Sequence, residues 1–129
     1  MSKYSEKKFF NSFKFAARGL AAAIKTQRNF RRQLVVAILT IIAIFLVGFP
    51  VGQLCILLLS IGFVLVAELF NSVIEFTIDA VFKNKYSVLA GAAKDMAAGA
   101  VCIASICAFT VGFIIFADRL LNFYGIMPL

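Results

Sequence analysis

Four of the six acidic residues in this sequence lie in one region, which suggests a shared chemical role. Three of them accompany an asparagine at intervals of three, four and four residues: Glu68, Asn71, Glu75 and Asp79. On a helix of 3.6 residues per turn, this spacing places the four side chains on one face. Glu68 and Glu75 would then lie about 10 Å apart along the helix axis. Two carboxylates arranged in this way can act on one site at different depths.

Phosphoryl transfer is the chemistry that this polar stripe fits. It requires a cation to bridge the phosphates, a positive side chain to offset developing charge, and a base to orient the acceptor hydroxyl. Glu75 and Asn71 offer the hard oxygen ligands that suit Mg²⁺. Lys94 offers the positive charge for the phosphates. Glu68, the deepest carboxylate, is placed to take the proton of an alcohol that remains in the bilayer.

Several other kinds of site are excluded by composition. The chain has no histidine, which rules out a histidine base and histidine-ligated zinc or haem. Its three cysteines lie in apolar runs without a CxxC pair and are expected to behave as small hydrophobes. The phosphate-binding GxxxxGK[ST] and GxGxxG loops are absent, so no soluble nucleotide-binding fold is indicated.

A structural role is the alternative for the same charged residues. Glu68 could form an ion pair with Lys94, and Asp79 with Lys83 would make an ordinary pair on an exposed helix. An isolated carboxylate toward the membrane centre is costly, however, and such residues usually face a bundle interior and mark function. Two glutamates, an asparagine and a Lys94-Asp95 pair exceed what packing requires, and the functional interpretation is therefore favoured.

The elements that must position these residues are membrane helices. Hydrophobic residues make up 63% of the chain and charged residues 15%, a balance foreign to soluble domains. Apolar runs predict transmembrane helices at about 32–49, 51–80 and 92–117, and the glycines and proline near Pro50 predict a tight turn between the first two. The expected fold is thus an all-α membrane protein with one integral membrane domain, residues 1–129.

An amphipathic helix is predicted to precede the three spans, at about residues 9–30. Apolar residues recur there at helical spacing while lysines and arginines occupy the remaining surface. This pattern is typical of an interfacial helix that lies on the membrane. Packing against a soluble partner is the alternative.

The distribution of positive charge predicts the topology. Nine of the thirteen lysines and arginines come before Leu34, and three more lie between Lys83 and Lys94. Basic segments stay on the cytoplasmic side, so the polar stripe is expected at the cytoplasmic face of the membrane. Because this charge flanks long uncharged stretches, it is read as a topology signal, and no nucleic-acid partner is expected.

Two segments resemble a known family. Residues 67–75 read AELFNSVIE and residues 93–101 read AKDMAAGAV. Together they are similar to the signature of the bacterial diacylglycerol kinase and undecaprenol kinase family, small integral membrane lipid kinases. Weaker similarity extends through residues 12–16 and 28–30, so that the resemblance covers nearly the whole chain.

The resemblance implies a homotrimer with composite active sites at the cytoplasmic membrane surface, using ATP with Mg²⁺ and a lipid alcohol. By motif, Glu68 would be the catalytic base, and Asn71 and Glu75 would serve the metal and the nucleotide. Lys94 and Asp95 would serve the phosphates and their surroundings. These roles agree with those assigned from the residue types.

Two positions depart from the family pattern. Gln27 stands where the family usually has a glutamate of the metal site, so that it could still coordinate the metal but adds no charge. Phe15 stands where a nucleotide-contacting tyrosine is common, which keeps an aromatic surface and removes a hydroxyl. Both are therefore candidate cofactor-binding residues, with Gln27 also a candidate metal ligand.

The acceptor is the remaining question. The segments 28–30 and 97–101 look more like undecaprenol kinases of Gram-positive bacteria than like diacylglycerol kinases, and we expect undecaprenol, with undecaprenyl phosphate as product. Diacylglycerol, with phosphatidic acid as product, is the alternative. A different class of protein is also considered, namely a non-enzymatic membrane protein or inactive paralogue whose carboxylates bind a cation. Gln27 is the best support for that alternative.

Overall fold

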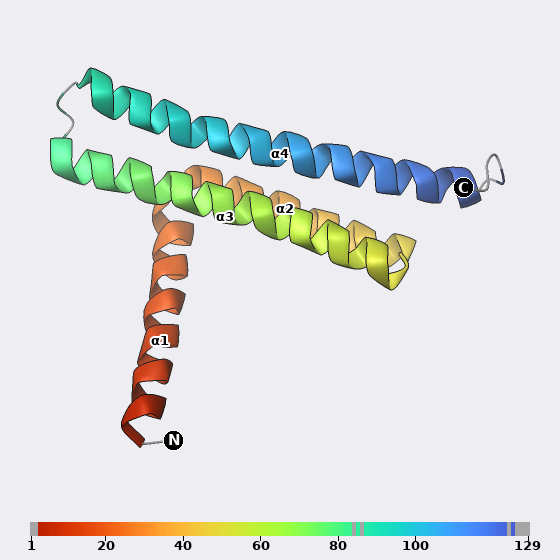
Figure 1. Ribbon diagram of the computed structural model, residues 1–129, viewed down its shortest axis with the longest axis horizontal. Helices are drawn as coiled ribbons and strands as arrows, with labels where there is room; N and C mark the ends of the chain where they lie inside the picture. Colours follow the sequence, from red (N-terminus) through yellow and green to blue (C-terminus); the bar gives the residue numbers. More distant parts are fainter. Residues whose placement is uncertain (1–2, 84, 86, 124, 126–129) are drawn as a thin grey trace.

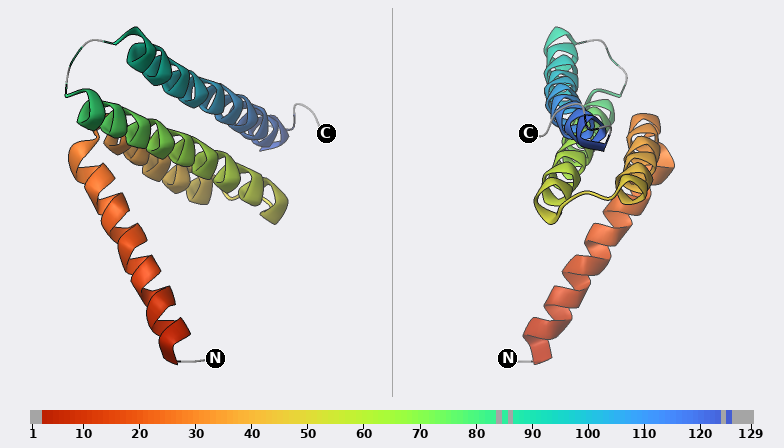
Figure 2. Two further views of the ribbon diagram at one scale, coloured as in Figure 1. Left: turned by 60° about the vertical axis from the view of Figure 1, so that its left-hand side comes forward. Right: turned by 90° about the vertical axis from the view of Figure 1, so that its right-hand side faces the viewer.

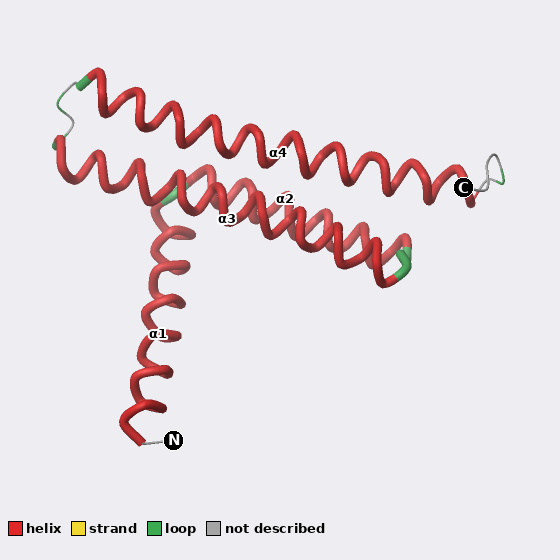
Figure 3. The backbone as a smooth tube through the Cα atoms, in the orientation of Figure 1, coloured by secondary structure: helices red, strands yellow, loops and turns green. Residues whose placement is uncertain are grey.

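The structure is a computed structural model of four helices joined by short connections (Figure 3). It describes residues 3–83, 85, 87–123 and 125, with side chains from residue 10 onward. Three long helices lie side by side and the first helix points away from them (Figure 1). Within the described residues all regular structure is helical, as the sequence predicts.

Helix α1 (Lys3–Thr26) stands roughly across the long helices, and both views of Figure 2 show it directed away from them. Large apolar side chains such as Phe10, Phe13 and Leu20 are exposed on it, while lysines and arginines fill much of the remaining surface. An amphipathic helix set across membrane spans has the orientation of a helix lying at the membrane surface.

Helices α2 (Arg28–Val47) and α3 (Val51–Phe82) run antiparallel through a tight turn. Gly48 ends α2 with φ 71°, in the left-handed half of φ space that glycine adopts freely, and its N–H donates to Ile44 O at 3.1 Å. Pro50 then precedes α3, where its missing N–H costs nothing. The turn predicted from this segment is therefore present.

Helix α4 (Val88–Phe123) returns antiparallel to α3 and packs along it more extensively than any other pair of helices. The buried positions of α4 are Ala90, Ala97 and Ala104, spaced by seven residues. Small residues at this spacing allow the backbones of two membrane helices to approach closely.

Helix α2 also packs against α3 through positions seven residues apart, here Phe30, Ala37 and Ile44. Helix α3 is thus the central element, with α2 and α4 both resting on it. Most other large apolar side chains of the three helices face outward. All three are long and apolar enough to cross a membrane, which is where such a surface is stable.

The helix bounds differ from the predicted ones at two places. The segment expected as one helix over 9–30 breaks at Gln27, whose extended backbone (φ −100°, ψ 108°) separates α1 from α2. Arg31 reaches back and donates to Ile24 O and Lys25 O, both at 3.0 Å, so it caps the end of α1. The third span, expected at 92–117, continues in both directions to make α4.

Candidate functional site

The candidate site is built on α3, at the level where α2 begins and α1 leaves the bundle. Helix α3 rises about 26 Å between Val51 and Glu68, a little less than the thickness of a bilayer core of about 30 Å. Because α2 runs antiparallel from Arg28, Glu68 lies at the level of the first turns of α2. The remaining part of α3 and the start of α4 extend beyond the point where α1 departs (Figure 1).

Three polar residues are buried on α3, while most buried side chains of the described chain are apolar. Glu68 is 3% exposed, and Asn71 and Ser72 are each 4% exposed. Glu68 Oε1 and Asn71 Oδ1 are buried without a hydrogen-bond partner in the described chain. Buried polar atoms are ordinarily paired, so these two oxygens mark a place where a proton, metal or ligand group would be accommodated.

The polar stripe becomes more exposed toward the end of α3. Asn71 Nδ2 donates to Glu75 Oε1 at 3.3 Å, which links the two residues across one helical turn. Glu75 is half-buried and Asp79 is exposed. Glu68, Asn71, Glu75 and Asp79 thus form a continuous series from the buried interior to the surface.

An ion pair joins the far end of this series to α4. Lys94 Nζ donates to Asp79 Oδ1, and both side chains remain partly exposed. Neither structural alternative drawn from the sequence is present, because Lys94 meets Asp79 instead of Glu68, and Lys83 is not the partner of Asp79. The pair fixes Lys94 beside the polar stripe, one turn beyond Glu75. It also holds the start of α4 against α3.

Gln27 lies at the junction of α1 and α2, close to the stripe. With Ser72 and Phe76 of α3 and small residues of α1, it lines a cavity of about 250 Å³. These two α3 residues belong to the same turns as Glu75. Gln27 therefore lies at the level of Glu75 along α3, although Glu75 does not line this cavity.

Two residues predicted to belong to the site, Phe15 and Asp95, are not buried with the polar stripe in a single chain. Phe15 is 64% exposed on α1, and its ring lies 5.9 Å from the guanidinium carbon of Arg18. Asp95 is exposed on α4 beside Lys94. Phe15 precedes Gln27 by twelve residues, about 18 Å along a helix axis, and α1 points away from the bundle (Figure 2), which separates Phe15 from the stripe of its own chain.

Magnesium is the cation that these residues fit. Within the described part of the chain, no three His, Cys, Asp or Glu side chains stand close enough to enclose a metal ion. Magnesium is usually held by one or two carboxylates and keeps water and phosphate oxygens as its other ligands. The half-buried Glu75 and the unpartnered Asn71 Oδ1 provide such an incomplete set of hard oxygen donors, with Gln27 at the same level along α3.

Ser72 is a buried residue that sequence reasoning missed. It follows Glu68 by four residues and lies on the same side of α3. The four-residue spacing from Glu68 could have indicated that Ser72 shares its face of the helix. A lone serine in an apolar helix usually bonds to the backbone of its own helix, however, and so does not by itself indicate a site. The role of Asp79 as the partner of Lys94 was also missed, because the two residues lie on different helices.

A second polar cluster occupies the opposite end of the bundle. Gln53 Nε2 donates to Asp118 Oδ2 at 3.3 Å, and Asn122 Nδ2 donates to Asp118 Oδ1 at 3.0 Å. This cluster ties the start of α3 to the end of α4. On α3, Gln53 precedes Glu68 by 15 residues, about 22 Å along the helix axis.

Comparison with known proteins agrees with the family resemblance found in the sequence. The sequence pattern of the prokaryotic diacylglycerol kinase family matches residues 14–116. An undecaprenol kinase of Bacillus subtilis is 39% identical over 113 residues, which cover 88% of this chain and 91% of that protein.

Two other relatives are named diacylglycerol kinases. A diacylglycerol kinase of Synechocystis is 38% identical over 101 residues, 78% of this chain and 58% of that protein. A diacylglycerol kinase of Haemophilus influenzae is 31% identical over 94 residues, 73% of this chain and 79% of that protein.

The resemblance first seen in two short segments is thereby confirmed over most of the chain. The relatives are kinases, which supports the predicted enzyme over a non-enzymatic membrane protein. The family pattern spans both segments that carry the buried stripe and Lys94. This chain therefore belongs to the prokaryotic diacylglycerol kinase family and is a membrane lipid kinase.

Proposed function

We propose that the protein transfers the γ-phosphate of ATP to undecaprenol, giving undecaprenyl phosphate and ADP. The observation that carries the chemistry is the buried, unpartnered carboxylate oxygen of Glu68 at the level of the membrane surface. The choice of acceptor is supported by the Bacillus subtilis undecaprenol kinase, whose similarity covers more of this chain than that of either diacylglycerol kinase.

Glu68 acts as the catalytic base in this proposal. It accepts the proton of the lipid hydroxyl as the hydroxyl oxygen forms a bond to the γ-phosphorus. The bond from the γ-phosphorus to the bridging oxygen breaks, and ADP leaves with that electron pair. The buried position of Glu68 excludes water from the acceptor side, which limits hydrolysis of ATP in place of transfer.

Glu75, Asn71 and Gln27 would hold Mg²⁺ together with the nucleotide. Bound there, the ion would offset the charge of the phosphates during transfer. Asn71 donates through Nδ2 to Glu75, which leaves Asn71 Oδ1 unpartnered and turned away from that bond. The amide thereby orients the carboxylate and offers an oxygen of its own. Gln27 adds an uncharged oxygen near the same turn.

Lys94 and Asp95 would serve the phosphates from the start of α4. In the ion pair with Asp79, Lys94 is held on the side of the bundle that carries the stripe. A triphosphate carries more negative charge than one carboxylate, so arriving ATP would draw Lys94 away from Asp79. Before ATP binds, the ion pair with Asp79 would keep the Lys94 side chain extended along the stripe.

The active site is proposed to be composite, within a homotrimer at the cytoplasmic membrane surface. Phe15 lies on a helix that points away from the stripe of its own chain, so a second copy would have to bring it to a nucleotide. The positive charge of α1 and of the connection between α3 and α4 supports a cytoplasmic site. Sedimentation equilibrium in density-matched detergent would give the mass of three chains.

Diacylglycerol is the second candidate acceptor, favoured by the names of two relatives. The two candidates are separated by incubating the purified protein in mixed micelles with Mg²⁺ and γ-labelled ATP, with each alcohol offered alone. The proposal predicts a larger kcat/KM for undecaprenol. A larger kcat/KM for diacylglycerol would reverse the choice of acceptor, and no transfer to either would contradict the proposed reaction.

A further inference from the structure

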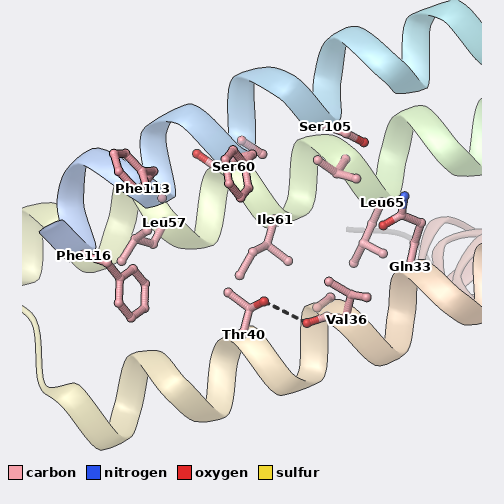
Figure 4. A pocket seen from close by; sticks show the side chains of 15 residues that line it. Gln33, Val36, Thr40, Leu57, Ser60, Ile61, Leu65, Ser105, Phe113 and Phe116 are labelled. Atoms are coloured by element: carbon pink, nitrogen blue, oxygen red, sulfur yellow. Dashed lines mark hydrogen bonds between the residues drawn. The ribbon is translucent and has the colours of Figure 1, made fainter.

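A cavity lies inside the predicted membrane region, away from the polar stripe. It has a volume of about 490 Å³ and is bounded by α2, α3 and α4 (Figure 4). Helices α2 and α4 each pack on α3 but scarcely touch one another, and the cavity occupies the space between them. Its volume lies within the range of about 300–1,000 Å³ typical of small-molecule sites.

The lining of the cavity is almost wholly hydrocarbon. Three hydroxyls line it, and two are already used, because Thr40 Oγ1 donates to Val36 O and Ser60 Oγ donates to Ile56 O, both at 2.8 Å. Ser105 is the third, and Gln33 is the one other polar side chain among the lining residues. The cavity therefore offers little to a ligand that needs hydrogen bonds along its length. It suits an apolar chain.

The two ends of the cavity differ in character. Gln33, a polar residue in the second turn of α2, lies at one end, as Figure 4 shows. Phe116 lies toward the other end, where its ring packs edge-on against Phe49 with the ring centres 4.8 Å apart. This aromatic pair joins α4 to the turn between α2 and α3. The cavity thus has a polar end at the level of the candidate site and an apolar end near the Pro50 turn, on the opposite side of the bundle.

The polar end of the cavity leads to the proposed base. Leu57, Ile61 and Leu65 of α3 line it, and residues at intervals of three or four share one face of a helix. Glu68 is the next residue on that face, about 4.5 Å along the axis beyond Leu65. An alcohol whose hydroxyl meets the Glu68 carboxylate would therefore have the cavity directly below it.

We propose that this cavity holds the hydrocarbon chain of the lipid alcohol while its hydroxyl lies at Glu68. The inference rests on the proposed function and adds a binding site for the acceptor chain. The cavity is polar at one end and apolar along its length, as a lipid alcohol is, and this match supports the assignment. The chain would run from Glu68 toward Phe116, and the remainder of a long isoprenoid would pass into the bilayer.

Gly112 provides a direct way to block the cavity. It lines the cavity on α4, and a Cβ added to it would meet no other atom within 4 Å. The Cβ of a leucine at this position therefore fits without displacing backbone, and the rest of the side chain would occupy space beside the cavity lining. Gly62 on α3 is a matched control, because a Cβ there also meets nothing within 4 Å and the residue does not line the cavity.

The test compares Gly112→Leu with Gly62→Leu on two acceptors, undecaprenol and a ten-carbon prenol. We expect Gly112→Leu to lower the ratio of kcat/KM for the long acceptor over the short one at least tenfold, because only the long chain needs the full cavity. Gly62→Leu should leave the ratio at the wild-type value. A wild-type ratio in Gly112→Leu would overturn the inference.

Photo-crosslinking keeps the inference testable if the proposed reaction fails. Wild-type protein without ATP is labelled with a diazirine analogue of undecaprenol, and the labelled peptides are identified by mass spectrometry. Label on α2 and α4 residues of the cavity, removed by excess undecaprenol and reduced in Gly112→Leu, supports the site. Label that undecaprenol does not remove, or that falls equally on outward residues such as Leu59, contradicts it.

A second copy of the chain is the other occupant that could fill the cavity. In that case Gly112→Leu would change the oligomeric mass in detergent, while Gly62→Leu would not. Such a change would overturn the inference in favour of an interface between copies. An unchanged mass together with a lowered acceptor ratio would leave the lipid chain as the occupant.

Discussion

Glu68 and Glu75 carry the same functional group on the same helix, but their surroundings differ. Glu68 is buried with one oxygen unpartnered, whereas Glu75 is half-buried and accepts a hydrogen bond from Asn71. A proton acceptor for a lipid hydroxyl must face the bilayer side, and a metal ligand must face the nucleotide side. The two positions along α3 therefore support different roles for the two carboxylates.

The first prediction concerns Glu75 as a metal ligand. Glu75→Gln keeps the size of the side chain and removes its charge, so the Mg²⁺ concentration for half-maximal activity should rise at least several-fold. A Mg²⁺ titration of lipid phosphorylation measures this. Asp118→Asn is the control, because Asp118 lies at the opposite end of the bundle, and it should titrate as wild type. An unchanged titration for Glu75→Gln would remove it from the metal site.

The second prediction concerns the ion pair between Asp79 and Lys94. If ATP must displace Asp79 from Lys94, then Asp79→Asn should lower the KM for ATP. Both side chains are partly exposed, and exposed pairs contribute about 0.2–1 kcal/mol, so the decrease should not exceed about fivefold. Lys94→Met should raise the KM for ATP. A raised KM in Asp79→Asn would instead make Asp79 part of the binding site.

The candidate site could be predicted from the sequence only along one helix. Helical spacing sufficed to place Glu68, Asn71 and Glu75 on one face of α3, because that relation depends on local geometry alone. The partner of Lys94 depends on how α3 and α4 are rotated about their axes, which local spacing does not determine. The remoteness of Phe15 likewise follows from the direction of α1 and not from its composition.

At the scale of elements, three spans were predictable because long uncharged runs have few other stable environments. The ends of these helices were harder to predict, because polar residues can extend a helix when their side chains find hydrogen-bond partners. Asp118 and Asn122 stay within α4 because they bond one another and Gln53. The break at Gln27 is accompanied by the long reach of Arg31, a contact that no periodicity indicates.

The third prediction tests that capping contact. Arg31→Met removes the donor to Ile24 O and Lys25 O, so the last turn of α1 should fray. A hydrogen bond of about 1 kcal/mol corresponds to about fivefold faster amide exchange in that turn. Hydrogen exchange read by mass spectrometry measures this. Arg32→Met, which removes the neighbouring charge, is the control, and equal acceleration in both variants would contradict the assigned role.

At the scale of the whole molecule, the fold orders its features along the membrane normal. The turn at Pro50 and the cluster around Asp118 lie at one end of the bundle, and the polar stripe and α1 lie at the other. Lysines and arginines concentrate at the second end. The positive-inside rule then predicts a single orientation for the bundle, in which the proposed nucleotide site would face the cytoplasm.

The fourth prediction tests this orientation. In a variant whose three cysteines are replaced by alanine, single cysteines are introduced as Lys85→Cys and Val51→Cys, at opposite ends of the bundle. A membrane-impermeant maleimide should label Val51→Cys in intact cells and Lys85→Cys only after the membrane is opened. The reverse pattern would place the polar stripe outside and rule out a cytoplasmic source of ATP for this site.

The most direct test of the account is transfer of labelled γ-phosphate to undecaprenol by Glu68→Gln beside the wild type, in the same micelles with Mg²⁺. The wild type should give labelled lipid, and the variant should transfer about 10²–10⁴-fold less, which is the usual contribution of a general base. Circular dichroism and oligomeric mass should remain those of the wild type. A well-folded Glu68→Gln protein that phosphorylates the lipid at the wild-type rate would contradict the account.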